Sequence, residues 1–316
     1  MSSPLAVFLD AGSVGDADLS SLQQLDIQLR LFAETKPELI VERLQDATIA
    51  IVNKTEISAS IVRQLPQLKY IAVTATGLNN IDVAAAEQAG IVVKNAEHYA
   101  NASVAQHVFA LLLQLTNQCQ AYQQAIRQGR WSQSPHFCLL DHPMIELAGK
   151  ALCIIGYGAL GQATAQLAKA FGMQVIIAER PGAPCRSGRV AFDHAVAIAD
   201  VISLHCPLTR HNYQLISTKQ FSLMKPTAIL INTARGALVD IQALMNALQS
   251  EKLYAAALDV LDIEPPPADH PALLCSHPRL LLSPHVAWAT AEARNRLMQQ
   301  VAQDLAQWLT ITVQRD

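Results

Sequence analysis

Three polar residues, Arg235, Glu264 and His285, come shortly after successive apolar segments in the last third of the chain. Ligands of parallel sheets bind at the carboxyl ends of the strands, so we expect these side chains to lie near one another. A histidine exchanges a proton near neutral pH, and a carboxylate on its other ring nitrogen fixes the tautomer and favours the imidazolium. An arginine can clamp a carboxylate and polarise a carbonyl. Together the set suits hydride transfer to a 2-keto acid, although each residue alone also fits a structural role.

A glycine-rich turn near the middle of the chain predicts where a nucleotide would bind. Residues 156–161 have the pattern GxGxxG, directly after the apolar segment 151–155 and before a helical periodicity that ends near Gly172. A second apolar segment, 173–178, then leads to Glu179. In such a unit the first glycine permits a tight turn, the second admits a pyrophosphate, and the third allows helix packing. The alternative is an ordinary glycine turn in another α/β protein.

Glu179 bears on which dinucleotide is bound. A carboxylate at this position accepts hydrogen bonds from the adenosine ribose hydroxyls and repels a 2′-phosphate, which favours NAD over NADP. Arg180, Arg186 and Arg189 follow closely and could offset that repulsion, or they could form a solvated loop. NAD is therefore the expected cofactor, with NADP the less favoured one.

The composition narrows the class of protein. The 316 residues suggest two domains of about 150 residues each, and 51% apolar residues are ample for two cores. A net charge of −3 argues against nucleic acid or anionic membrane partners. The six cysteines have neither CxxC nor metal-ligand spacing, so we expect no metal and reduced thiols in a cytoplasmic protein. Neither a signal segment nor an apolar run of about 18 residues is evident.

Strands and helices alternate through both halves of the chain. Six parallel strands, two of them flanking the glycine turn, predict a doubly wound NAD-binding (Rossmann) sheet. Residues 101–127 form a long apolar helical stretch, and the last helix, 292–309, could return to the front half. The expected domains are therefore a substrate-binding (lid) domain, 1–99 with 292–316, and an NAD-binding domain, 100–291. The expected strands are 6–9, 27–31, 49–53, 70–74 and 91–94 in the first half, and 151–155, 173–178, 201–204, 228–231, 255–258 and 280–282 in the second.

The chain resembles the D-isomer-specific 2-hydroxyacid dehydrogenases over essentially its whole length. The resemblance rests on the glycine turn with Glu179, on HCPLT at 205–209, on NTARG at 232–236, on 259–265, and on SPH at 283–285. It implies an α/β fold with a smaller, flavodoxin-like substrate domain that is discontinuous in sequence. It also implies that Arg235 binds substrate, His285 is the acid/base and Glu264 supports it.

The resemblance further implies a cofactor and a substrate site. Asp259 would contact the nicotinamide carboxamide. Thr76 and Gly77, in a front-half loop, would offer backbone N–H groups to substrate, although this loop has Ala75 where the family has its first glycine and Asn79 where it has an aspartate. The implied cofactor-binding residues are Gly156, Gly158, Ala159, Leu160, Gly161, Glu179, Cys206, Pro207, Thr233, Ala234, Arg235, Asp259 and His285.

Within the family, three features resemble the glycerate dehydrogenases, or hydroxypyruvate reductases. They are WSQSP with Phe137-Cys138 around Trp131, the AER sequence that ends the second strand, and Trp288 just after the histidine. An indole there would narrow the substrate site for a small, unphosphorylated acid, although Trp131 and Trp288 could instead pack at an interface. The expected reaction is therefore reduction of hydroxypyruvate, or glyoxylate, by an oxidoreductase that dimerises through its NAD-binding domain. Two alternatives stay open: a D-lactate-type dehydrogenase and an NAD(H)-sensing corepressor.

Overall fold

The computed structural model describes residues 3–313 and divides into two compact units. The first unit consists of the described residues up to Ala100 and from Trp288 onward, and the second is Asn101–Ala287. The chain therefore leaves the first unit once, forms the second, and comes back. The return occurs at Trp288 rather than at Glu292, the position that the sequence suggests.

The first unit contains a five-stranded parallel sheet with the order β2-β1-β3-β4-β5. This is the flavodoxin-like order of a doubly wound sheet. Of the three inner strands, β3 and β4 are buried along their whole length and β1 along all but its first residue, whereas the edge strands β2 and β5 are partly exposed. The strands are β1 Leu5–Phe8, β2 Gln28–Leu31, β3 Ile49–Val52, β4 Tyr70–Val73 and β5 Val92–Asn95.

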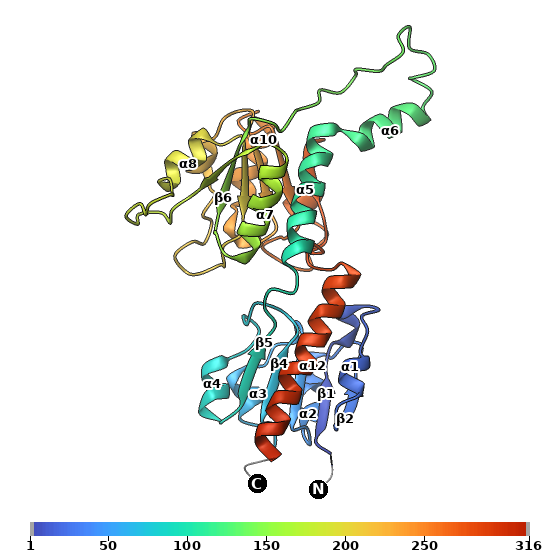
Figure 1. Cartoon of the computed structure of the whole chain (residues 1–316), viewed down its shortest axis with the longest axis vertical. Coiled ribbons are helices and arrows are strands. Elements are labelled where there is room, and N and C mark those ends of the chain that lie inside the picture. The colour runs from blue at the N-terminus through green and yellow to red at the C-terminus, as the bar shows by residue number, and fades with distance from the viewer. Residues whose placement is uncertain (1–2, 314–316) are drawn as a thin grey trace. The chain divides into compact units, whose positions relative to one another are not determined.

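The C-terminal helix α12, Ala291–Val313, belongs to this first unit. Its Trp308 ring lies against Tyr70 of β4, with centroids 5.0 Å apart. Arg294 donates to the Val14 carbonyl at 2.8 Å, and Figure 1 shows α12 crossing the sheet near β4. The other helices of the unit are short: η1 Ala11–Val14, α1 Ser20–Gln23, η2 Pro37–Leu39, α2 Ile40–Leu44, α3 Ala59–Val62 and α4 Val83–Gln88.

The second unit is a six-stranded parallel sheet in the order β11-β10-β9-β8-β6-β7. A single parallel bridge between Ala178 and Val190 extends the sheet beyond β7. With that bridge as a vestigial third strand, the order is that of a Rossmann fold, and it reverses between β6 and β8. The strands are β6 Ala151–Ile155, β7 Gln174–Ile177, β8 Val201–Leu204, β9 Ile229–Asn232, β10 Ala255–Leu258 and β11 Leu280–Leu282.

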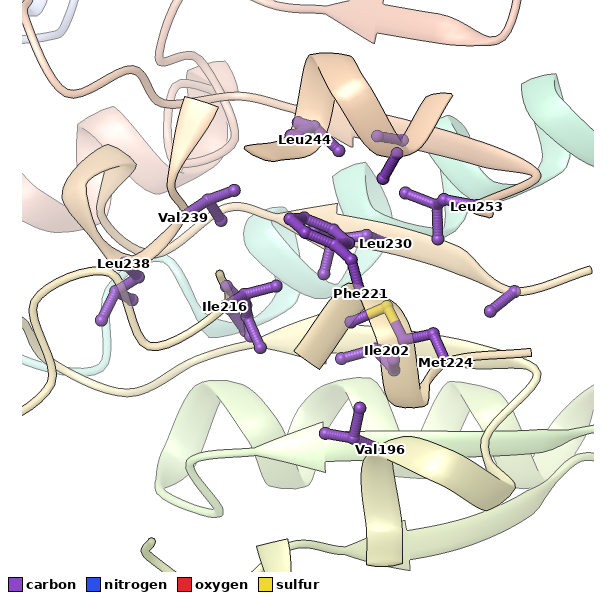
Figure 2. Packing of buried hydrophobic residues seen from close by; sticks show 14 of the residues in the cluster. Val196, Ile202, Ile216, Phe221, Met224, Leu230, Leu238, Val239, Leu244 and Leu253 are labelled. Carbon is purple, nitrogen blue, oxygen red and sulfur yellow. The ribbon is translucent and has the colours of Figure 1, made fainter. Parts of the chain in front are cut away.

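Helices cover both faces of this sheet. Helices α5 and α7 lie side by side on one face, where Phe109 stacks on Phe171 with ring centroids 4.9 Å apart (Figure 1). On the other face, Figure 2 shows Phe221, Leu230 and Leu244 in the apolar cluster that joins β8 and β9 to α9 and α10. The helices are α5 Asn101–Asn117, α6 Cys119–Arg127, α7 Ala159–Ala170, α8 Phe192–Ile198, α9 Thr218–Leu223, η3 Gly236–Leu238, α10 Ile241–Gln249 and α11 Pro271–Leu274.

The helix expected over residues 101–127 is interrupted, which corrects the sequence-based prediction. Gln118 has a left-handed backbone, with φ of 53°, so the chain turns between α5 and α6. The carbonyl of Thr116 accepts a hydrogen bond from Ile145 at 2.9 Å instead of continuing the helical ladder. In Figure 1 the segment after α6 then extends away from the sheet before the chain enters β6. In the described part of the chain, no helix is both long and apolar enough to cross a bilayer.

Candidate active site

The turn between β6 and α7 presents bare backbone at the point where the strand order reverses. A Cβ on Gly156 would lie 2.5 Å from the Cys206 nitrogen, and one on Gly161 would lie 2.2 Å from the Gly156 oxygen. A Cβ on Gly158 would meet nothing within 4 Å. Packing within the chain therefore requires the first and third glycines. The second faces open space at the start of α7, where Ala159 and Leu160 follow, and this supports the predicted pyrophosphate site.

A buried hydroxyl beyond β9 has no hydrogen-bond partner among the described residues. It is Oγ1 of Thr233, a residue that is 9% exposed. Buried hydroxyls are normally satisfied, so a ligand or a water is expected here. The neighbouring Ala234 is buried too, and its N–H donates to Asn232 Oδ1 at 3.0 Å. The open space at Gly158 and this hydroxyl both fit a dinucleotide that crosses the carboxyl edge of the sheet.

Glu179 lies just beyond β7 and is 2% exposed. Its carboxylate forms a two-point ion pair with Arg186, whose Nε and Nη2 each lie 2.6 Å from one carboxylate oxygen. The backbone N–H of Arg180 adds a hydrogen bond of 2.9 Å. Hydrogen bonding from Arg186, more than any other contact, lowers the pKa of Glu179 from 4.5 to about 2. The sequence placed arginines nearby but could not reveal this pairing.

His285 and Glu264 are brought together from loops that follow adjacent strands. His285 Nδ1 lies 2.6 Å from Glu264 Oε2, and the Leu261 N–H donates to Glu264 Oε1 at 2.9 Å. The two side chains are 28% and 33% exposed, respectively. The carboxylate can therefore fix the ring tautomer, and the imidazole remains accessible to a ligand.

Arg235 follows β9, the strand beside β10, and is half-buried. Its Nη1 donates to the Ala234 carbonyl at 2.7 Å. No carboxylate in residues 3–313 forms an ion pair with it, so its charge is available to an anion. A Cβ on Gly236 would lie 1.9 Å from the carbonyl carbon of Leu261. This close approach packs the Arg235 loop against the loop that holds Glu264.

Asp259 is 1% exposed and binds the loop that carries His285. Its carboxylate accepts hydrogen bonds from the Val286 and Ala287 N–H groups at 3.0 and 2.9 Å and from Ser283 Oγ at 2.5 Å. His107 of α5 contacts the same group, with Nε2 3.4 Å from Asp259 Oδ1. Burial alone would raise the pKa of Asp259, but hydrogen bonds from His107, Ser283 and the backbone outweigh it and hold that pKa below its ordinary value.

The sequence prediction did not include His107 in the site. His107 lies on α5, whose apolar periodicity indicates only that the helix packs against other elements. The structure shows that His107 Nε2 lies 2.9 Å from Ser283 Oγ. Asp259 was expected at the nicotinamide. Within the chain its carboxylate accepts from Ser283 Oγ and from two backbone N–H groups of the loop that carries His285, and its contact with a nicotinamide stays a prediction.

The remaining predicted positions are divided between the two units. Cys206 and Pro207 follow β8, where burial raises the pKa of the Cys206 thiol and the Pro207 carbonyl accepts from Asn212 at 2.8 Å. Thr76 lies in the first unit beyond β4, and its carbonyl accepts from Asn95 at 2.8 Å, which fixes the loop next to Gly77. Trp288 also belongs to the first unit, where its ring meets Tyr99 edge-on, with centroids 6.4 Å apart.

Residues 3–313 contain no group of three or more metal-ligating side chains that could hold an ion. The six cysteines are all free thiols. A second histidine, His205, follows β8: burial lowers its pKa to about 4, its Nε2 lies 2.9 Å from Ser203 Oγ, and its buried Nδ1 has no hydrogen-bond partner in the described residues.

Known proteins resemble this chain in both sequence and fold. Residues 109–287 match the model of the D-isomer specific 2-hydroxyacid dehydrogenase NAD-binding domain. A glycerate dehydrogenase from Methylorubrum extorquens is 43% identical over 271 residues, which cover 85% of each chain. A hydroxypyruvate reductase from Blautia hydrogenotrophica is 36% identical over 301 residues, which cover 93% of each chain. The solved structure of an acyclic imino acid reductase with NADPH and D-Arg aligns over 97% of each chain, with a TM-score of 0.86 and 29% identity.

Proposed function

The chain belongs to the D-isomer specific 2-hydroxyacid dehydrogenase family and is an NAD(P)-dependent enzyme of 2-hydroxyacid reduction, and we propose that its reaction is the reduction of hydroxypyruvate to D-glycerate by NADH. The main structural support for this reaction is the 2.6 Å contact between His285 Nδ1 and Glu264 Oε2, beside the loop of Arg235. The similarity to glycerate dehydrogenase and hydroxypyruvate reductase supports the choice of substrate.

The histidine supplies the proton that reduction requires. Addition of hydride to the keto carbon leaves negative charge on its oxygen, and an acid must neutralise it. Glu264 holds Nδ1 of His285, so we assign the proton transfer to Nε2. The carboxylate stabilises the imidazolium before transfer and keeps the ring oriented afterwards. In the reverse direction the same nitrogen accepts the proton of the D-2-hydroxyacid.

Arg235 binds and polarises the substrate. Its guanidinium is half-buried and forms no ion pair with a carboxylate in the described residues, which suits a clamp on the substrate carboxylate and the adjacent carbonyl oxygen. The backbone N–H groups of Thr76 and Gly77 are proposed to donate to the same carboxylate. The side chain of Trp288 is proposed to restrict the size of the substrate. The proposed substrate is therefore a small, unphosphorylated 2-keto acid.

The cofactor is assigned to the edge that begins at Gly158 and includes Thr233. A reduced nicotinamide supplies the hydride when it is bound there. Gly158 leaves room for a pyrophosphate at the N-terminus of α7, and Thr233 Oγ1 lacks a partner in the described residues that a ligand could provide. The carboxylate of Glu179 can accept a ribose diol once the Arg186 side chain moves away from it, and NADH is the proposed cofactor.

A substrate panel tests this proposal directly. Initial rates would be measured with hydroxypyruvate, glyoxylate and pyruvate, each with NADH and with NADPH. We expect the highest kcat/KM with hydroxypyruvate and NADH. A higher value with pyruvate would make the protein a D-lactate-type enzyme. No turnover of any 2-keto acid, combined with tight NADH binding, would favour a nucleotide-sensing role instead.

We also propose that two copies associate through the second unit. The segment after α6 exposes large apolar side chains, with Phe137 93%, Leu140 76% and Met144 59% exposed. A pocket between α5 and α7 is lined by apolar residues, among them the exposed Ala102 and Ala110, together with asparagine and glutamine side chains, and exposed apolar surface marks association sites. Sedimentation equilibrium should give a dimer, and Phe137→Glu with Leu140→Glu should give a folded monomer. A wild-type monomer at micromolar concentration would refute the assembly.

A further inference from the structure

The carboxylate of Glu179 has no hydrogen-bonding capacity left for a ribose. Its Oε1 accepts from the Arg180 N–H and from Arg186 Nη2. Its Oε2 accepts from Arg186 Nε at 2.6 Å and from the Arg186 N–H at 3.3 Å. Two carboxylate oxygens offer about four lone-pair sites. A ribose diol can therefore reach both oxygens only if the Arg186 side chain moves away.

The guanidinium of Arg186 presents its other side to solvent. Nε and Nη2 are used by Glu179, while Nη1 has no hydrogen-bond partner in residues 3–313. The Arg186 side chain is 54% exposed, in contrast to the 2% of Glu179. A planar guanidinium with an outward donor is a preferred partner of phosphate oxygens.

The surrounding charges also favour an anion. Arg189 lies 3.9 Å from Glu179 Oε2 through its Nε and is 23% exposed, and the Arg180 side chain is exposed. The loop therefore places two guanidinium groups, those of Arg186 and Arg189, at one carboxylate, and the exposed Arg180 adds a third positive charge to the same loop. The expectation that Glu179 repels a 2′-phosphate holds for an isolated carboxylate, whereas this one is neutralised by a two-point ion pair.

We propose that Arg186 determines the choice between NADH and NADPH at the adenosine ribose. When it is paired with Glu179, its Nη1 binds a 2′-phosphate. When it swings away, Glu179 accepts the ribose diol. Arg186 thus competes with NADH for the carboxylate and lets NADPH bind as well. This inference rests on the proposed dinucleotide site at residues 156–161 and deepens it.

Equilibrium binding tests the proposal without turnover. Dissociation constants would be measured by fluorescence titration for NADH and NADPH, and by calorimetry for 5′-AMP and its 2′-phosphorylated form. Arg186→Gln should weaken NADPH binding by about 10- to 100-fold, the worth of one charge-assisted hydrogen bond. The same substitution should tighten NADH binding several-fold, because the carboxylate is released.

A matched control separates the effect of the ion pair on dinucleotide binding from the effect of the positive charge of the loop. Arg180→Gln removes the same charge from the same loop, but Arg180 contacts Glu179 only through its backbone N–H. It should change the NADH-to-NADPH affinity ratio by less than about threefold, as an exposed, screened charge does. Equal changes in the two variants would overturn the proposal.

A double substitution tests the competition itself. In a Glu179→Gln background, Arg186→Gln should no longer tighten NADH, because there is no carboxylate to release. A gain of the same size in both backgrounds would overturn the proposal. Circular dichroism and Tm would confirm that each variant is folded. Arg186→Lys keeps the charge but cannot bridge both oxygens, so it should change the two affinities less than Arg186→Gln does. If wild-type protein bound neither dinucleotide, the proposed function would fail, and this inference with it.

Discussion

Asp259 holds His285 in place from two directions. The backbone carbonyl of Asp259 accepts the His285 N–H at 2.7 Å, and its buried carboxylate accepts the N–H groups of Val286 and Ala287. His285 has a left-handed backbone, with φ of 54°, a conformation that costs a non-glycine residue about 1 kcal/mol or more. The hydrogen bonds to Asp259 offset this strain, so the residue that presents the imidazole is fixed by a carboxylate that need not touch the reacting atoms.

Asp259→Asn should destabilise the second unit. An amide cannot accept at both positions, and a buried N–H left without an acceptor costs roughly 1–3 kcal/mol. For a unit of this size we expect Tm to fall by roughly 3–10 °C, measured by calorimetry at pH 7. Asp193→Asn, which affects only an exposed pair with Lys219, is the control and should leave Tm nearly unchanged.

The same variant should alter the pH dependence of stability. The folded pKa of Asp259 lies below its ordinary value of 3.8, so its charge contributes stability that is fully present above about pH 4 and is lost as the pH falls through the folded value. The Tm difference between wild type and Asp259→Asn should therefore be constant from pH 5 to 7 and shrink below pH 4. A difference that grows in acid would contradict this assignment.

The fold could be predicted from sequence because its signals are local. The buried strands β8 and β10 and the partly exposed strand β11 have the bounds that their apolar runs suggest, and the glycine turn identifies the start of α7. The turn at Gln118 could not be predicted, since a glutamine gives no signal for a left-handed backbone. Side-chain partners are equally non-local: the contact of His107 with Ser283 joins residues 176 positions apart.

His285→Ala should remove the proposed proton donor and leave the proposed dinucleotide site intact. General acid catalysis typically contributes about 10²- to 10⁴-fold, so we expect kcat to fall within that range. The Kd for NADH, measured by fluorescence titration, should change by less than about threefold, because the pyrophosphate site at Gly158 is untouched. Loss of NADH binding in this variant would show that the residue supports the nucleotide site rather than the proton transfer.

Arg235→Ala should affect both substrate binding and the chemical step. The guanidinium is proposed to hold the substrate carboxylate and to stabilise the developing alkoxide, so KM should rise and kcat should fall. Loss of a charge-assisted hydrogen bond predicts at least about a tenfold decrease in kcat/KM. Steady-state kinetics with hydroxypyruvate measures both parameters. A change confined to KM would limit the role of Arg235 to ground-state binding.

Gly158→Ala and Gly156→Ala should separate the effect of a glycine on cofactor binding from its effect on the stability of the fold. Gly158 has φ of −83°, which alanine adopts readily, and a Cβ there meets no protein atom within 4 Å. This variant should keep its Tm within about 2 °C and lose about 10-fold or more in NADH affinity, because the methyl group occupies the pyrophosphate position. Gly156 has φ of 99°, and a Cβ there would lie 2.5 Å from the Cys206 nitrogen, so Gly156→Ala should lower Tm markedly. Unchanged NADH affinity in Gly158→Ala would move the pyrophosphate elsewhere.

Cys153 should be inert in the native protein despite being a free thiol. It lies in β6 with no exposed surface, and burial raises the pKa of its thiol from 9.0 to about 12. At pH 8 the reactive thiolate is then about one part in 10⁴, and the sheet also blocks access to it. Treatment with N-ethylmaleimide followed by peptide mass spectrometry should label the exposed Cys185 within minutes and leave Cys153 unmodified until guanidinium unfolds the chain. Labelling of Cys153 at the rate of Cys185 in native protein would mean that the sheet opens at β6 on that timescale, which the burial of Leu152 and Ile154 and the pairing of β6 with both β7 and β8 argue against.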